Sequence, residues 1–198
     1  MKMESSILNE MGNLFIAIKL EAAPRLIKLV RNTQVLMRKE RIRWIPDVEL
    51  NVKLADINVS GTDDLKGVIA KLNGLVEGMP TFSTNIRGFG NMGSHLLSAG
   101  VEQNSDFLTL RQKLNEALVD YKEPDQIDFV PNILLARINS LVDKRLFFKL
   151  VDANRMIEFD ELQVKEVCLM SSELNAYGPV VSVKESFQLE EQFIEEAV

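Results

Sequence analysis

The apolar residues of this chain occur in short runs whose spacing changes repeatedly between that of a strand and that of a helix. Residues 14–20 are almost continuously apolar, and residues 48–56 alternate between apolar and polar, so both are predicted strands. Between them, Pro24 and the apolar face that follows it predict a helix to about residue 39. The other predicted elements are two helices with Thr62 and Ser105 as their N-caps, a helix over 143–154, and strands beginning at residue 82 and over 96–101, 127–138, 164–170 and 180–187.

This order of elements, β-α-β-α-β-β-α-β-α-β-β, predicts an α+β fold of two lobes, with mostly antiparallel sheets and helices on their outer faces. A length of 198 residues suits one domain or two small lobes that share a core. We predict a single domain over residues 13–189, preceded by an N-terminal extension, residues 1–12, and followed by an acidic tail, residues 190–198. No internal repeat is evident from residue identity.

Charge and hydropathy exclude several classes of protein. The net charge is −6, and four glutamates in the last ten residues supply −4 of it. This disfavours a protein that is basic overall and binds nucleic acid through its whole surface, but it allows a local basic groove. The apolar run at residues 14–18 is far shorter than the ~20 residues of a membrane span, and residues 1–13 lack the pattern of a signal peptide. We therefore expect a cytoplasmic protein without membrane association.

The chain contains one histidine, His95, and one cysteine, Cys168. One histidine excludes any mechanism or metal site that uses two, and one cysteine excludes an internal disulfide and a cysteine-based zinc site. We expect no metal and no cofactor. His95 is predicted to lie in a loop that follows the glycines of residues 88–93, which we interpret as turn residues. Cys168 is predicted to be a packed, inert thiol within a strand.

Four stretches of the chain share their order and spacing with a known family: residues 14–18, residues 43–54 beginning Arg-Trp-Ile-Pro, residues 128–137 beginning Asp-Phe-Val-Pro, and residues 164–179. They resemble the 2H phosphoesterase superfamily, and within it the bacterial RNA 2′,3′-cyclic phosphodiesterases, historically called 2′-5′ RNA ligases. The resemblance spans nearly the whole chain. It implies the two-lobed fold of the 2′-5′ RNA ligases, with a central cleft.

The superfamily is named for two His-x-Thr or His-x-Ser motifs that face each other across this cleft. One histidine acts as general base and the other as general acid, and the hydroxyls hold the phosphate. The resemblance places the first motif at Glu49-Leu50-Asn51 and the second at Asn132-Ile133-Leu134, so both histidines are absent. Asn132 transfers no proton near neutral pH, and Leu134 cannot hydrogen-bond a phosphate oxygen, although Asn51 can.

The candidates for ligand binding are Arg43, Trp44, Lys53, Phe129 and Arg137. Lys53 continues the polar row of the first motif, Arg43 and Arg137 are suited to an anion, and Trp44 and Phe129 are suited to stacking on a base. Each also has a plainer interpretation as a solvated strand face, a surface ion pair or core packing. By strand alternation, Arg137 lies on the face opposite the second motif unless a bulge intervenes.

We therefore predict a 2H phosphoesterase-like protein that is catalytically inactive and keeps a cleft for a nucleotide, an RNA end or another ligand. Two alternatives stay open. One is an active phosphoesterase with altered chemistry, in which Glu49 is the base and Arg137 holds the anion. Repulsion disfavours it, because two like charges ~5 Å apart cost ~3 kcal/mol at an effective dielectric of 20. The other is a structural or protein-interaction module, and the sequence leaves its oligomeric state open.

Overall fold

The computed structural model of the protein describes residues 13–122, 129–176 and 178–191. The predicted N-terminal extension and most of the acidic tail lie outside these residues. In chain order the elements are β1 (Asn13–Lys19), α2 (Pro24–Leu36), β2 (Arg41–Trp44), the 3-10 turn η1 (Asp47–Glu49), β3 (Asn51–Ile57), α3 (Thr62–Val76), β4 (Phe82–Met92), β5 (Leu96–Val101), α4 (Ser105–Ala117), β6 (Asn132–Ser140), α5 (Lys144–Ala153), β7 (Glu158–Val164), β8 (Glu166–Asn175) and β9 (Gly178–Gln188).

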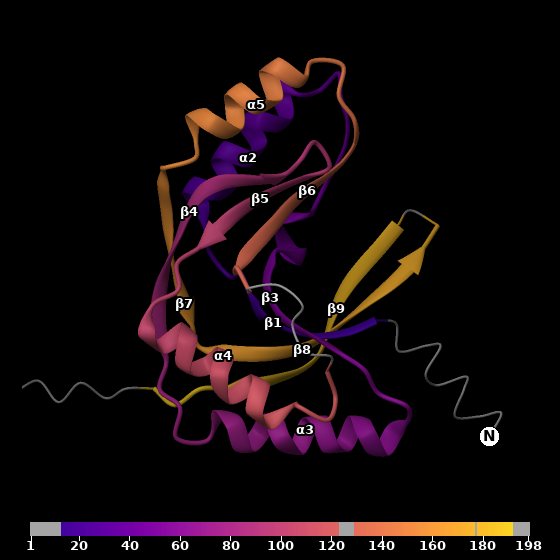
Figure 1. Ribbon diagram of the computed structural model, residues 1–198, viewed down its shortest axis with the longest axis vertical. Coiled ribbons are helices and arrows are strands. Elements are labelled where there is room, and N and C mark those ends of the chain that lie inside the picture. The colour runs from indigo at the N-terminus through magenta and orange to yellow at the C-terminus, as the bar shows by residue number, and fades with distance from the viewer. Residues whose placement is uncertain (1–12, 123–128, 177, 192–198) are drawn as a thin grey trace, which may run out of the picture.

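The named strands form one curved sheet in the order β7-β4-β5-β6-β3-β1-β8-β9, with β2 also paired to β6. Every pairing between them is antiparallel. One lobe contains β2 and β4 to β7, and the other contains β1, β3, β8 and β9. The lobes join where β3 and β6 pair through Val52 and Ile133. The predicted two-lobed, antiparallel α+β class is confirmed (Figure 1).

The four helices of the described residues pack on the sheet from outside. α2 contacts β7 and α5 contacts β4 in the first lobe, whereas α3 and α4 pack together and α3 contacts β9 in the second. Their apolar faces and one face of the sheet bury a shared core, because strand residues such as Ile86, Ala99, Val52 and Ile133 are fully buried. The alternate residues of these strands remain on the other face of the sheet. No helix among the described residues is long and apolar enough to cross a bilayer.

Several parts of the predicted element list are wrong, among them the N-caps of α3 and α4, which are Gly61 and Asn104, and the start of the strand predicted from residue 127, which begins at Asn132. β2 and β7 were not predicted, and the strand predicted from residue 48 begins only at Asn51. The residues before it form η1, whose Leu50 N–H donates to the carbonyl of Asp47. The glycines of residues 88–93 do not form a separate loop, since β4 continues to Met92 and the turn is formed by the residues around Gly93, where φ is +56°.

Glu190, the first residue of the predicted acidic tail, belongs to the folded body. Its side-chain carboxylate accepts a hydrogen bond from the backbone N–H of Gly78 at 2.8 Å. Its own N–H donates to the carbonyl of Met79, and its carbonyl accepts from the N–H of Thr81, each at 2.8 Å. These bonds attach the end of the described chain to the segment that follows α3.

Helix α2 is capped by a distant strand. Its N-cap residue, Ala23, has no polar side chain, and Asp160 of β7 instead accepts hydrogen bonds from the backbone N–H groups of Leu26 at 2.9 Å and Arg25 at 3.3 Å. We expect Asp160→Ala to lower the free energy of unfolding by about 1–2 kcal/mol, measured by urea denaturation. Asp160→Asn keeps an acceptor and should lose less. An alanine variant as stable as the wild type would contradict this capping role.

Candidate functional site

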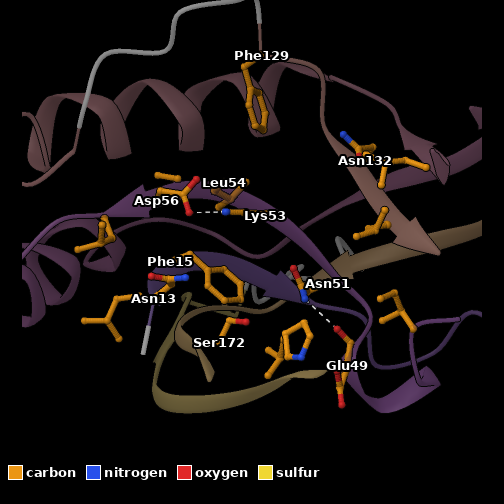
Figure 2. A pocket seen from close by; sticks show the side chains of 18 of the residues that line it. Asn13, Phe15, Glu49, Asn51, Lys53, Leu54, Asp56, Phe129, Asn132 and Ser172 are labelled. Carbon is orange, nitrogen blue, oxygen red and sulfur yellow. Dashed lines mark hydrogen bonds and ion pairs between the residues drawn. The ribbon is translucent and has the colours of Figure 1, made fainter. Parts of the chain in front are cut away.

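A groove of about 1060 Å³ lies where the two lobes meet, on the face of the sheet opposite the core. Strands β1, β3 and β6 and the segments before β3 and β6 line most of it (Figure 2). Its polar and charged lining side chains include Asn13, Glu49, Asn51, Lys53, Asp56, Asn132, Arg137 and Ser172. The predicted central cleft is therefore present.

The pairing of β3 with β6 decides which side chains face this groove. Val52 and Ile133 are cross-strand partners, and both are fully buried on the core side. In an antiparallel pair the flanking residues also lie opposite one another, and they point to the other face of the sheet. The four flanking residues all line the groove: Asn51 opposite Leu134, and Lys53 opposite Asn132.

Each of the two strands carries a bulge just after these positions. In β3 the register with β1 skips Leu54, and in β6 the register with β5 skips Leu135. One extra residue reverses the alternation of the side chains that follow. Asp56 and Arg137 are thereby returned to the groove face, and both line the groove. The sequence placed Arg137 on the face opposite the second motif unless a bulge intervened, and β6 contains such a bulge.

The two strands are related as an internal repeat. Residues 51–56 read Asn-Val-Lys-Leu-Ala-Asp and residues 132–137 read Asn-Ile-Leu-Leu-Ala-Arg, with the bulged leucine at the same place in each. The pattern Asn-x-x-Leu-Ala is the signal in the sequence that could have revealed this repeat. By this symmetry the counterpart of Asn132 is Asn51, whereas the sequence placed the first motif two residues earlier, at Glu49.

The hydrogen bonds of the two asparagines follow the same symmetry. The Asn51 side-chain amide donates to the carbonyl of Glu49 at 2.8 Å, and that of Asn132 donates to the carbonyl of Val130 at 3.0 Å, in each case two residues back. Figure 2 shows the carboxylate of Glu49 pointing away from Asn51. Both strands therefore present a side-chain amide to the groove at the same place in their pattern.

Lys53 carries the positive charge nearest to these amides on β3. Its ammonium forms an ion pair with Asp56, and it lies 5.3 Å from the centroid of the Phe15 ring. The Lys53 side chain is 48% exposed, so the pair is an ordinary surface ion pair of small net energy. An anion in the groove can therefore compete with Asp56 for the ammonium.

The structure brings three of the five predicted ligand-binding candidates to the groove, namely Lys53, Phe129 and Arg137. Phe129 overhangs the groove (Figure 2), and its ring is held by Phe107, with the ring centroids 6.4 Å apart and the planes at 14°. The other two candidates are placed elsewhere. Arg43 donates to the carbonyl of Pro179 at 2.9 Å, and Trp44 packs against the core.

His95 and Cys168 are not among the residues that line the groove. His95 is exposed in the turn between β4 and β5. Cys168 is fully buried in β8, and this burial raises the pKa of its thiol to about 11. The thiol is therefore protonated and unreactive at neutral pH.

No known family profile matches the chain, whereas individual curated proteins and solved structures do. An RNA 2′,3′-cyclic phosphodiesterase of Methanothermobacter thermautotrophicus is 23% identical over 153 residues, which are 75% of this chain and 83% of that protein. The crystal structure of TT0787 of Thermus thermophilus matches with a TM-score of 0.71 and 23% identity over 91% of this chain and all of that one.

A further solved structure, E. coli LigT complexed with 3′-AMP, matches with a TM-score of 0.68 and 18% identity over 90% of this chain and 98% of that one. The chain is thus similar in sequence to RNA 2′,3′-cyclic phosphodiesterases and shares the fold of TT0787 and LigT, which confirms the resemblance that its sequence predicted.

Proposed function

We propose that this protein has lost cyclic phosphodiesterase activity and uses its groove to bind the phosphate end of a nucleotide or an RNA. The observation that carries the proposal is the pair of amides, Asn51 and Asn132, on facing strands β3 and β6. A positioned acid or base contributes ~10²–10⁴ in rate, and an amide side chain supplies neither. Loss of both groups lowers the rate by ~10⁴–10⁸ while leaving the groove in place.

The remaining groups of the groove suit a bound phosphate. Lys53 and Arg137 are cationic, and side-chain amides can exchange a backbone partner for a phosphate oxygen. Leu134, opposite Asn51, gives no hydrogen bond, so the phosphate is expected on the side of Lys53 and Asn132. The similarity to LigT, which was solved with 3′-AMP, supports a nucleotide as the ligand.

We expect Lys53→Ala to weaken the binding of 3′-AMP about tenfold in an isothermal titration, because a charge-assisted hydrogen bond is lost. Asp56→Asn should strengthen binding, because it removes the carboxylate that competes for Lys53. The matched control is Lys66→Ala, which breaks a similar exposed pair with Asp63 on α3, away from the groove. If Lys53→Ala and Lys66→Ala bind 3′-AMP equally well, the phosphate position is wrong.

An active enzyme that uses Glu49 and Arg137 is the alternative, and hydrolysis of 2′,3′-cyclic AMP separates it from the proposal. Under the proposal, the wild type converts 2′,3′-cyclic AMP no faster than heat-denatured protein does. Chromatography of the product measures this rate. Turnover that disappears in Glu49→Ala would reject it. If the wild type neither turns over 2′,3′-cyclic AMP nor binds 3′-AMP or inorganic phosphate, the protein is a structural or interaction module.

A further inference from the structure

The groove continues beyond β6 into a second basin of about 550 Å³. The basin lies over β4 and β5 and is bounded by the turn that follows α5. The two hollows share five lining residues: Met92, Leu96, Val130, Asn132 and Leu134. A ligand that reaches Asn132 from the side of Lys53 therefore meets the second basin directly.

The strand pairing aligns cationic side chains along this path. Asn132 is the partner of Gly100 on β5, and Gly100 is the partner of Arg87 on β4. Cross-strand partners point to the same face of a sheet, so Lys53, Asn132 and Arg87 form one row. Three interstrand spacings separate Lys53 from Arg87, or about 14 Å, which is too far for one phosphate to bridge.

Small residues form the floor of this path, so no large side chain fills it. Gly100 contributes no side chain between Asn132 and Arg87, and in the neighbouring row Leu134 is followed by Ser98 and then Gly90. The rim, in contrast, carries large exposed apolar side chains. Val130 is 68% exposed, Met92 71% and Met156 90%. A flat ring can lie on such a floor and contact these side chains at its edges.

Two arginines lie in the second basin, and each has a surface carboxylate as its partner. Arg87 pairs with Glu102 at 3.1 Å, and Arg155 pairs with Asp152 at 2.9 Å. The arginine side chains are 55% and 60% exposed. Such pairs contribute only ~0–1 kcal/mol, so either guanidinium can exchange its carboxylate for a phosphate, which it binds in bidentate geometry.

We propose that the second basin is a subsite for a further nucleotide, with Arg87 holding its phosphate, so that the ligand is a single-stranded RNA end of two or more nucleotides. The inference rests on the proposed function, because the position of the terminal phosphate at Lys53 determines which nucleotide of the RNA reaches the second basin. Cations spaced along a path with apolar rims match a chain that alternates phosphates with flat bases. Glu158 at the end of the row, beside Arg87, limits the path to a short segment.

The test compares 3′-UMP with a uridine hexanucleotide that carries a 3′-phosphate, by fluorescence anisotropy and titration calorimetry. In the wild type the hexanucleotide should bind at least about tenfold more tightly. Arg87→Ala should weaken hexanucleotide binding about tenfold, with a much smaller effect on 3′-UMP. It should also reduce the slope of log K against log salt by about 0.7, the value for one phosphate contact to a single strand.

Two further variants separate this subsite from a general charge effect. Glu102→Gln keeps the hydrogen bond to Asn85 and frees Arg87, so it should tighten hexanucleotide binding severalfold. Arg31→Ala breaks a comparable exposed pair with Asp47 outside the second basin and should behave as the wild type does.

The outcomes distinguish this inference from the proposed function. If 3′-UMP and the hexanucleotide bind equally and Arg87→Ala changes neither, the subsite is overturned and phosphate binding in the first groove stands. If neither ligand binds the wild type, both are overturned. If a polyglutamate peptide of equal charge binds as tightly as the hexanucleotide and depends equally on Arg87, the assignment to RNA is overturned.

Discussion

Replacement of Asn51 and Asn132 by histidine, together with Lys53→Thr and Leu134→Thr, is expected to create the 2′,3′-cyclic phosphodiesterase activity that we propose the wild type has lost. The four positions face one groove from the paired strands β3 and β6. An acid and a base placed there should together raise the rate by ~10⁴–10⁸ over the wild type, and either histidine alone by no more than ~10²–10⁴. Conversion of 2′,3′-cyclic AMP, followed by chromatography, measures the gain.

A second quadruple variant tests the register of the first motif. It places histidine and threonine at Glu49 and Asn51 and keeps the same changes in β6. Glu49 lies in η1 and outside the strand pair, so a histidine there should not face Asn132→His across the groove, and we expect this variant to be inactive. Activity in this variant, and none in the first, would show that the symmetry of β3 and β6 has been misread.

The expected activity should also depend on pH in a defined way. A mechanism that needs one neutral and one protonated imidazole gives a bell-shaped profile around the usual histidine pKa. Variants with a single histidine should lose one limb of this bell. A gain of activity without such a profile would point to electrostatic help from the new side chains rather than to proton transfer.

The sequence predicts those elements of the fold whose apolar pattern is strong by itself. Strand β5 spans Leu96–Val101, as predicted, and helix α3 begins at Thr62, one residue earlier than predicted, because Gly61 and not Thr62 is its N-cap. β7 was missed because charged and polar residues fill most of its positions, and one of them, Asp160, caps α2. β2 has only four residues, too few to show alternation, and is held by its pairing with β6. Tertiary contacts, rather than local propensity, define both strands.

The candidate site was also predicted only in part, because its register depends on pairing between strands that are far apart in the sequence. Glu49-Leu50-Asn51 alternates as regularly as Asn51-Val52-Lys53, so nothing local marks where the strand begins. The pairing of Val52 with Ile133, 81 residues apart by number (133 − 52), fixes the register. The bulge that turns Arg137 into the groove likewise depends on β5, because Ser98 pairs with Leu134 and Leu97 with Ala136. Long-range register of this kind is not encoded by alternation alone.

Gly88→Ala is expected to lower the free energy of unfolding by about 2–5 kcal/mol, the largest loss that we predict for a single substitution. Gly88 has a φ of +66°, where a residue with a Cβ costs ~1–2 kcal/mol. A Cβ there would also overlap the backbone carbonyl oxygen of Arg155, and overpacking adds ~1–3 kcal/mol. Urea denaturation measures the loss.

Gly78→Ala separates these two causes. Gly78 has nearly the same φ, +68°, but nothing lies within 4 Å of an added Cβ, so this variant should lose only the conformational ~1–2 kcal/mol. The excess loss in Gly88→Ala then measures the close approach to Arg155. Equal losses in the two variants would contradict that approach.

The same contact links stability to the second basin. The N–H of Gly88 donates to the carbonyl of Ile157 at 2.8 Å, and that of Phe89 donates to the carbonyl of Asn154 at 2.9 Å. These bonds hold the turn that carries Arg155 and Met156 against β4. A Cβ at Gly88 must push this turn outward, so Gly88→Ala should weaken hexanucleotide binding more than 3′-UMP binding, even where the protein is still folded. If both ligands lose affinity equally, the turn does not form one wall of the RNA path.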